Sequence, residues 1–424
     1  MLQLNYIREN REEVIRRLAV KNYDGGEIIG KIMELDEKRR DTQKRLDDSL
    51  AESNVLAKEI GGLFQQGRAS EANAMKEKTA RLKSLSKELA TRMEEITLEL
   101  EALLVQVPNL PHDKVRPGHS AADNEIVHTW GDIAALGELA KPHWDLAGEY
   151  DIIDFELGSK VTGAGFPFYK GKGAKLQRSL INFFLDEALA AGYTEFQPPL
   201  FVNEDSAYGT GQLPDKDGQM YFMQIDKLYA IPTAEVPITN IYRDVILKAQ
   251  DLPVKNVAYS SCFRREAGSY GKDVRGLNRL HQFDKVEIVH IAHPDTSYEN
   301  LEAMREYVAS LLIKLELPFR ILRLCGGDMS FTSAMTYDFE VYSGAQKRWL
   351  EVSSVSNFES FQANRMKLRF KDEDGKTRIA HTLNGSALAL PRIVAALLEN
   401  NQTPDGIRIP KALTRFTGFE FITK

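Results

Sequence analysis

The sequence has few cysteines, no long apolar run and a polar beginning. Its 424 residues include only two cysteines, Cys262 and Cys325, too few for a disulfide framework or a thiolate zinc cage. No stretch approaches the roughly 20 consecutive apolar residues that span a bilayer, and the opening residues are too polar for a secretory signal. We therefore expect a cytoplasmic protein with no membrane partner.

An excess of positive charge and the common phosphate-binding loops are also missing. The 55 basic and 61 acidic residues give a formal net charge of −6, which excludes a globally basic nucleic-acid binder. A nucleic-acid partner would have to contact a local patch. The sequence has no G-x-x-x-x-G-K-[ST] motif and no G-x-G-x-x-G after a strand-like run, so a nucleotide would have to bind side chains on a sheet.

Two heptad-like stripes predict long helices in the first 108 residues. A single stripe on each arm must be buried, and the break at residues 65–70 contains Gly67, so we expect an antiparallel helical hairpin. The first stripe consists of Ile28, Ile32, Leu35, Arg39, Thr42, Leu46, Ser49, Ser53, Leu56, Ile60 and Leu63. The second consists of Leu82, Leu85, Leu89, Met93, Ile96, Leu100 and Leu103.

The remaining sequence predicts a mixed α+β domain. Pro108 and Pro111 end the hairpin, and we interpret residues 109–150 as a linker and the start of the main body, which occupies residues 151–424. Helix and strand signals are interspersed irregularly there, which favours a mostly antiparallel sheet flanked by helices. The helix signals lie at 174–191 and 297–316, and the strand-like runs at 255–264, 279–292, 319–325 and 337–342.

Residues 261–287 carry the most informative polar pattern. They indicate two strands joined by a polar loop at 267–278, with Arg264 and Glu266 on one face by strand alternation. Alternation on the return strand groups His281, Phe283, Lys285 and Glu287. An arginine, an aromatic ring and carboxylates on one face suit an adenine nucleotide. From the hairpin alone, a surface of mixed charges around one exposed phenylalanine remains the alternative.

The string F-R-x-E, a loop and R-x-H-Q-F resembles motif 2 of the class II aminoacyl-tRNA synthetases. The longer string FRREAGSYGKDVRG…HQFDKVE is similar to the seryl-tRNA synthetases in particular. The resemblance covers the whole chain: the hairpin, the V-P-N-L-P linker and the catalytic body. It implies a tRNA-binding hairpin domain at residues 1–108 and a class II catalytic domain.

Other family elements occur in order along the chain. Residues 174–199 resemble motif 1, which implies a homodimer interface, and residues 231–235 resemble the loop that receives the amino acid. Thr233 also resembles a helix N-cap, and the two roles are compatible. Residues 350–354 resemble the ATP and magnesium segment. Glu351 and Ser354, three apart, would lie on opposite faces of a regular strand, so a bulge or a strand end is expected there.

Residues 384–392 resemble motif 3, with departures from the glycine-richer family string at Ala387 and Pro391. We expect Pro391 to start a helix that carries Arg392. The resemblance implies catalytic roles for Arg264, Glu266 and Arg392. It implies ATP binding by Arg264, Arg265, Glu266, His281, Gln282, Phe283, Glu351, Val352, Ser353, Ser354 and Arg392. It implies serine binding by Thr233, Ala234, Glu235, Arg264, Glu287, Asn384 and Ser386, and Mg²⁺ binding by Glu351 and Ser354.

The implied reaction is the ATP-dependent attachment of L-serine to tRNA(Ser) through seryl-adenylate, with tRNA(Sec) as a further implied substrate. The alternatives are a class II synthetase for another amino acid, a class II-like ligase that charges no tRNA, and a coiled-coil interaction protein with a vestigial class II domain. Residues 31–105 contain 14 Lys+Arg and 15 Asp+Glu, so the arm is not a basic rod. We expect tRNA phosphates to meet a local cluster, the alternative being an arm that only packs on another protein. The cluster consists of Lys38, Arg39, Arg40, Lys44 and Arg45.

Overall fold

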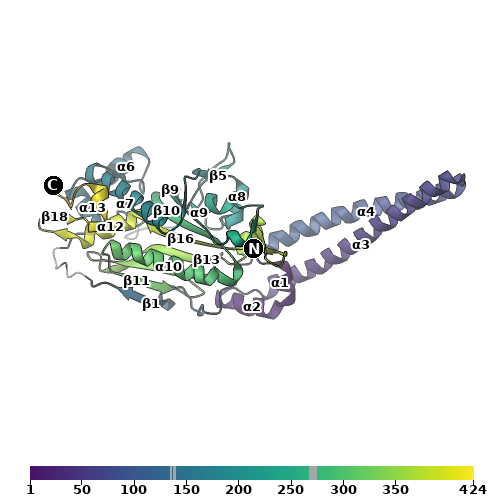
Figure 1. The fold of residues 1–424 in the computed structure, drawn as a ribbon, viewed down its shortest axis with the longest axis horizontal. Coiled ribbons are helices and arrows are strands. Elements are labelled where there is room, and N and C mark those ends of the chain that lie inside the picture. Colours follow the sequence, from purple (N-terminus) through teal and green to yellow (C-terminus); the bar gives the residue numbers. More distant parts are fainter. Residues whose placement is uncertain (134–135, 137–139, 267–274) are drawn as a thin grey trace. The chain divides into compact units, whose positions relative to one another are not determined.

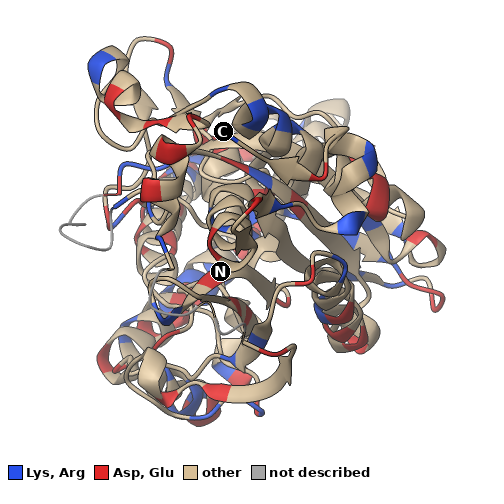
Figure 2. Cartoon of the chain, turned by 90° about the vertical axis from the view of Figure 1, so that its left-hand side faces the viewer, with Lys and Arg blue, Asp and Glu red and all other residues tan. Residues whose placement is uncertain are grey.

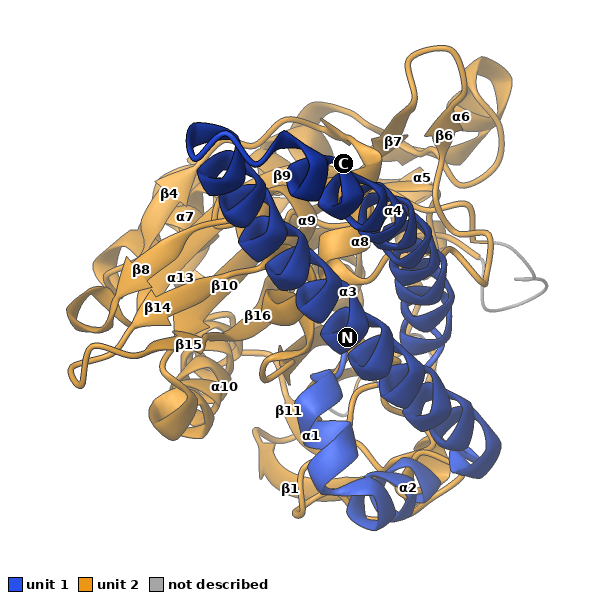
Figure 3. Ribbon diagram, turned by 90° about the vertical axis from the view of Figure 1, so that its right-hand side faces the viewer, with its two compact units in different colours: residues 1–19, 23–108 blue, residues 20–22, 109–424 orange. Residues whose placement is uncertain are grey.

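The structure is a computed structural model that describes residues 1–133, 136, 140–266 and 275–424. Most of the loop predicted at 267–278 lies outside these residues. The chain divides into two compact units, residues 1–19 with 23–108 and residues 20–22 with 109–424 (Figure 3).

The first unit contains the helical hairpin that the sequence predicts. Two short helices, α1 (Leu4–Glu9) and α2 (Arg11–Val20), precede the long helices α3 (Gly26–Gln65) and α4 (Ala69–Leu104). The long helices pack against each other along their length (Figure 1). Gly67 in the connecting turn has a φ of 76°, a conformation that glycine adopts without steric cost.

The seam between α3 and α4 departs from the predicted stripe at Leu85. Leu85 is 38% exposed, whereas Ser86 is buried and its hydroxyl lies 2.9 Å from that of Ser49 on α3. With Ser86 in place of Leu85, the steps from Leu82 to Leu100 alternate regularly between four and three residues. A serine can occupy this buried position because the two hydroxyls satisfy each other's hydrogen-bonding capacity.

The second unit is built on an eight-stranded sheet in the order β1-β11-β12-β13-β16-β10-β9-β4. All pairs are antiparallel except β4 with β9, which confirms the predicted α+β class with a mostly antiparallel sheet. The strands are β1 (Glu125–Trp130), β4 (Thr194–Phe196), β9 (Val254–Phe263), β10 (Gln282–Ala292), β11 (Phe319–Arg323), β12 (Met335–Ser343), β13 (Arg348–Asn357) and β16 (His381–Ala389).

Helices cover both faces of this sheet. Successive side chains of β9 and β10 point to opposite faces of the sheet. On one face they pack with α7, α10 and α12 in a large apolar core, and on the other with α9 and α11 in a smaller one. The helices are α5 (His143–Glu149), α6 (Phe155–Val161), α7 (Gly171–Ala190), α8 (Glu204–Thr210), α9 (Glu235–Asn240), α10 (Ser297–Lys314), α11 (Phe361–Met366), α12 (Leu390–Asn400) and α13 (Lys411–Thr417). The short strands are β2 (Ile153–Asp154), β3 (Phe168–Tyr169), β5 (Phe201–Val202), β6 (Phe222–Met223), β7 (Leu228–Ala230), β8 (Ile246–Lys248), β14 (Arg369–Lys371), β15 (Thr377–Ile379), β17 (Gln402–Thr403), β18 (Gly406–Arg408) and β19 (Phe421–Ile422).

Part of the segment interpreted as a linker belongs to this framework. β1 pairs with β11 at the edge of the large sheet, and α5 packs against α12. Both escaped prediction because β1 is mostly exposed without alternation and α5 is too short to show a period. Acidic and basic segments are interspersed over the elements visible in Figure 2. Within the described ranges, no helix combines the length and apolar character needed to cross a membrane.

Candidate active site

A cavity of about 190 Å³ lies where the motif 2-like strands, β13, β16 and α12 meet. Eight of the predicted site residues line it: Arg264, Glu266, Phe283, Glu351, Val352, Ser353, Ser386 and Arg392. The remaining lining residues are Leu277, Asn278, Arg279, Leu280, Lys285, Ala389 and Pro391. The cavity is therefore lined by residues from three segments: the motif 2-like strands, the segment 350–354 that resembles the ATP and magnesium segment, and the motif 3-like segment 384–392.

Arg264 and Phe283 form one wall of the cavity. β9 ends at Phe263, and the Arg264 amide continues the pairing by donating to the carbonyl of His281 at 2.9 Å. The Arg264 guanidinium lies 5.3 Å from the centre of the Phe283 ring, and its Nε donates to the carbonyl of Pro232 at 3.4 Å. The wall thus presents a cation held over an aromatic face.

Glu266 reaches the same cavity by a route that strand alternation did not predict. Its φ is 48°, which lies outside any strand conformation. Its carboxylate accepts from Nε of Arg279 at 3.1 Å. The expectation that Arg264 and Glu266 share a strand face is wrong, because the strand ends before both residues; the backbone turn brings them together instead.

Arg392 and Glu351 line the cavity as well. Phe339 of β12 pairs with Ser353 while Glu340 pairs with Glu351, so Val352 is the extra residue of the bulge that the spacing predicted. Arg392 is the third residue of α12, directly after Pro391, and its Nη1 donates to the Glu351 carbonyl at 2.5 Å. Its Nη1 also lies 3.7 Å from the Glu351 carboxylate.

The residues beside Glu351 fit a divalent cation. Asp338 pairs with Ser354 across β12 and β13, and its Oδ1 is buried with no hydrogen-bond partner among the residues that the structure describes. Burial, followed by the negative charge of Glu351, raises the pKa of Asp338 well above its ordinary value. The described part of the chain contains no group of three or more histidine, cysteine or acidic residues arranged to hold a metal ion by itself. One or two carboxylates are nevertheless what Mg²⁺ takes from a protein when substrate phosphates complete its coordination.

A buried polar cluster adjoins the cavity. Glu287 is 1% exposed and accepts hydrogen bonds from the Thr233 hydroxyl at 3.1 Å and the Asn384 amide at 3.2 Å. Lys285, which lines the cavity, also forms an ion pair with Glu287. Strand alternation predicted that Lys285 shares a face with Glu287 but indicated no role for it; the ion pair makes Lys285 the link between the cluster and the cavity.

Glu235 belongs to the same cluster. Its Oε1 accepts from the Gln362 amide at 2.6 Å, and burial, opposed by this hydrogen bond and reinforced by the charge of Glu287, raises its pKa from 4.5 to about 7. Thr233 lies one residue before the N-cap position of α9, which Ala234 occupies. The Thr233 Oγ1 still accepts from the Glu235 amide at 3.2 Å, so it supports the start of the helix while bonding Glu287.

Four predicted ATP-binding residues do not line the cavity: Arg265, His281, Gln282 and Ser354. The Arg265 guanidinium lies 5.8 Å from the centre of the Tyr221 ring, and the Tyr221 hydroxyl lies 3.0 Å from Nδ1 of His281. Gln282 is exposed at the start of β10. Roles for these four residues remain predictions.

The hairpin carries a hollow of about 810 Å³ between α3 and α4, and four basic residues are among those that line it: Lys38, Arg45, Lys87 and Arg92. The predicted basic cluster is therefore divided. Arg39 and Arg40 bind the carboxylate of Asp36, which is fully buried, at 2.9 and 3.1 Å. Lys87 and Arg92 come from α4, which the sequence cluster did not include.

Comparison with known proteins assigns both parts of the chain. Residues 1–111 match the Seryl-tRNA synthetase N-terminal domain, and residues 221–401 match the tRNA synthetase class II core domain (G, H, P, S and T). The chain is 52% identical over 421 residues to the serine–tRNA ligase of Salinibacter ruber, covering 99% of this chain and 98% of that protein. It is 44% identical over 424 residues to the serine–tRNA ligase of Akkermansia muciniphila, covering 100% and 99%.

A solved structure agrees over the same length. The seryl-tRNA synthetase of Pyrococcus horikoshii, complexed with ATP, superposes with a TM-score of 0.93 at 33% identity, covering 100% of this chain and 99% of that one. The similarity to these proteins therefore extends over the whole chain. It includes the hairpin, the antiparallel sheet and the residues that line the cavity. The chain belongs to the seryl-tRNA synthetase family.

Proposed function

We propose that this protein activates L-serine with ATP and transfers it to tRNA(Ser). The observation that carries the proposal is the link between the cavity and the buried cluster: Lys285 lines the cationic and aromatic cavity and forms an ion pair with Glu287, whose charge in turn acts on Glu235. The cavity suits a polyphosphate and a base, and the cluster suits a small ammonium compound with a hydroxyl. The ATP complex of the Pyrococcus relative supports the same assignment.

The proposed first step joins serine to the nucleotide. The serine carboxylate attacks the α-phosphorus of ATP, a bond to the β-phosphate oxygen breaks, and seryl-adenylate and pyrophosphate form. Arg264 would bind the α-phosphate, Phe283 would stack the adenine, and Arg392 would bind the γ-phosphate, so that both guanidiniums offset charge that develops during the displacement. A bound Mg²⁺ held by Glu351 and Ser354, with Asp338 beside them, would supply further charge neutralisation on the phosphates.

Serine would occupy the cluster of Thr233, Glu235, Glu287 and Asn384, with Ser386 between it and the nucleotide. Glu287 already accepts bonds from Thr233, Asn384 and Lys285, which holds its carboxylate in one orientation. Lys285 would balance the charge of Glu287 and approach the reacting carboxylate of serine. In the second step, the 3′-terminal adenosine hydroxyl of tRNA attacks the adenylate carbonyl and AMP leaves.

The test is amino-acid-dependent ATP–pyrophosphate exchange across the amino acids. Serine alone should support rapid exchange. Alanine should be rejected by about 10⁴–10⁵-fold, because a site built to bond a hydroxyl leaves polar groups unpaired without it. Exchange with another amino acid would indicate a sister synthetase, and absence of exchange would favour a coiled-coil interaction protein.

The hairpin is the proposed tRNA-binding element. The hollow, which Asp41, Glu88 and Glu95 line as well, would offer the cations of Lys38, Arg45, Lys87 and Arg92 to tRNA phosphates, and binding there should weaken as salt rises. Charging of tRNA(Ser) and tRNA(Sec) transcripts at increasing salt tests this element. Efficient charging of tRNA(Ser) with none of tRNA(Sec) would restrict the proposal to the first substrate.

We also propose that the protein acts in the cytoplasm as a homodimer formed around α7 and β4. A hollow of about 690 Å³ there includes Phe168, Ile181, Leu185 and Phe196, and Phe168 is 41% exposed. A second copy would cover these apolar groups. Sedimentation velocity should give a species of about twice the 47.9 kDa chain mass.

A further inference from the structure

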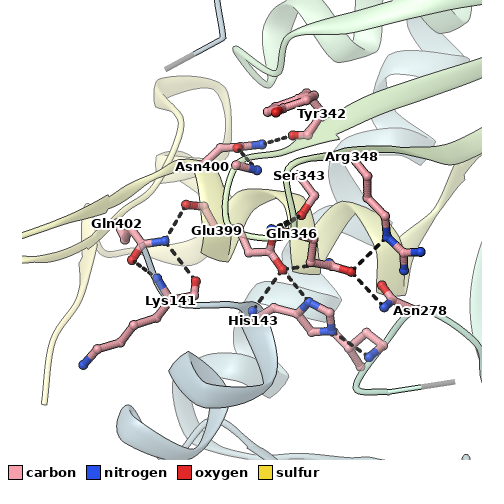
Figure 4. A network of polar contacts seen from close by, with 12 residues as sticks. Lys141, His143, Asn278, Tyr342, Ser343, Gln346, Arg348, Glu399, Asn400 and Gln402 are labelled. Carbon is pink, nitrogen blue, oxygen red and sulfur yellow. Dashed lines mark hydrogen bonds and ion pairs between the residues drawn. The ribbon is translucent and has the colours of Figure 1, made fainter. Parts of the chain in front are cut away.

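A buried hydrogen-bond network lies behind the cavity wall and is not used by the proposed chemistry (Figure 4). Its centre is the pair His143 on α5 and Glu399 on α12, both fully buried. The Glu399 Oε1 accepts from the backbone amide of His143 at 3.0 Å and lies 2.7 Å from its Nδ1. Ser343 donates to the other oxygen, and the Gln346 amide donates to Oε1 at 3.0 Å.

One arm of the network holds the backbone of the segment 275–279, which contributes Leu277, Asn278 and Arg279 to the cavity. The Leu277 amide donates to Nε2 of His143 at 2.8 Å. A backbone N–H can only donate, so Nε2 is the acceptor and Nδ1 carries the proton given to Glu399. The approach is close: a Cβ on Gly276 would lie 2.3 Å from His143 Nε2, and its φ of 67° also requires glycine.

The other arm fixes the orientation of an amide on the cavity wall. The Glu399 carboxylate can only accept, so it turns the NH₂ group of Gln346 toward itself and the Gln346 oxygen toward Asn278. Asn278 must then present its own NH₂ group to Gln346, at 3.2 Å, which leaves its Oδ1 on the other side. That oxygen is buried and has no hydrogen-bond partner within the described residues.

α12 therefore holds the same segment at two points. Arg392 donates through Nε to the Asn278 carbonyl at 3.2 Å, and Glu399, two turns later on the helix, acts through His143 and Gln346. Burial raises the pKa of Glu399, but the hydrogen bonds from His143 and Ser343 outweigh it and lower the pKa below its ordinary value. The carboxylate is thus charged and acceptor-only at neutral pH, as the relay requires.

We propose that His143 and Glu399 are positioning residues for the nucleotide: they fix the Leu277 backbone and the Asn278 amide orientation, and thereby present the Asn278 carbonyl to Arg392 and its Oδ1 to ATP. The inference rests on the assignment of the cavity to ATP. Wild-type serine-dependent exchange tests that assignment separately. Loss of the network affects ATP and leaves the serine cluster, which shares none of these residues, unaltered.

Two substitutions of His143 separate the contacts. H143N keeps a donor near the place of Nδ1 but cannot reach Leu277, whereas H143Q places an oxygen near the position of Nε2 and keeps that acceptor. In ATP–pyrophosphate exchange, H143N should raise the KM for ATP by about tenfold, the equivalent of one ordinary hydrogen bond, and change the KM for serine by less than about twofold. H143Q should restore most of the ATP affinity.

A third variant and a control complete the test. Gln346→Met, in the turn between β12 and β13, removes the relay to Asn278 without touching His143 and should also raise the KM for ATP severalfold. Gln402→Ala removes bonds to Lys141 on the far side of Glu399 and should leave both KM values unchanged. An unchanged KM for ATP in folded H143N, or in Q346M if H143N does not fold, would overturn the proposal. Equal changes in the two KM values would overturn it as well, because they would show a merely structural role.

Discussion

The buried carboxylate of Glu235 should make both stability and serine use depend on pH. Burial raises its pKa from 4.5 to about 7 in the folded protein, whereas the unfolded chain titrates near the ordinary value. In the window between these values the folded state binds more protons than the unfolded state. The free energy of unfolding must therefore fall as pH rises through the window.

The magnitude follows from the two pKa values. Each unit of difference corresponds to about 1.4 kcal/mol, so wild-type protein should lose about 2.5 kcal/mol of stability between pH 5 and pH 8 through this group alone. Glu235→Gln keeps the shape and the hydrogen bond to Gln362 but removes the titration. The free energy of unfolding of the variant should lack this pH-dependent contribution. Relative to the wild type, the variant should therefore become more stable as pH rises.

Urea denaturation followed by tryptophan fluorescence measures the difference. All three tryptophans, Trp130, Trp144 and Trp349, lie in the second unit, so the signal reports on the unit that contains Glu235. Parallel pH profiles for wild type and Glu235→Gln would refute the reasoning. Titrating groups that do not interact with Glu235 contribute equally to both proteins and cancel in the comparison.

The same titration should appear in the kinetics. Ionised Glu235 offers a counter-charge to the serine ammonium, and its ionised fraction rises from about one tenth at pH 6 to about nine tenths at pH 8. The KM for serine should fall about tenfold over this range, while the KM for ATP serves as the internal control. Glu235→Gln should show a weak, flat dependence. A tenfold change that persists in the variant would assign the titration to another group.

Arg264→Ala should lower serine-dependent exchange about 10²–10³-fold in protein shown to be folded, and near-normal exchange would contradict the role of this guanidinium. Glu287→Ala should raise the KM for serine more than the KM for ATP; an unchanged serine KM would remove Glu287 from the serine site. Replacing residues 31–105 with a short glycine linker should preserve exchange while tRNA charging falls steeply, so unimpaired charging at limiting tRNA would reject the hairpin's role. Asp338→Asn should raise the Mg²⁺ concentration needed for half-maximal exchange, and an unchanged Mg²⁺ dependence would exclude Asp338 from the ion site.

The sequence predicted the elements that have a periodic apolar pattern or end at a turn residue such as glycine. The two heptad stripes and Gly67 specified the antiparallel hairpin, and alternation specified β9 to within one residue at each end. The spacing of Glu351 and Ser354 predicted a bulge, which is present at Val352. Such signals are readable because a periodic pattern reports which face of one element is buried.

Other features depend on neighbours that are distant in the sequence. Leucine is more apolar than serine, yet Ser86 and not Leu85 is buried in the seam, because its hydroxyl forms a hydrogen bond with Ser49 on the facing helix. The carboxylate of Asp36 on α3 is fully buried, and Arg8 of α1, which is 28 residues away in the sequence, binds it at 3.2 Å. No single-segment pattern could indicate these pairings, since the partner determines whether a polar group can be buried.

The sequence by itself determined the class of fold, the family and eight of the residues that line the cavity, because these rest on periodicity and on contiguous motifs. Only the tertiary structure decided which groups share an electrostatic environment. It placed Asp338 beside Glu351, joined Lys285 to Glu287 and buried His143 against Glu399. The physical reason is that desolvation and Coulomb interactions depend on distances through space, which the order of residues along the chain does not specify.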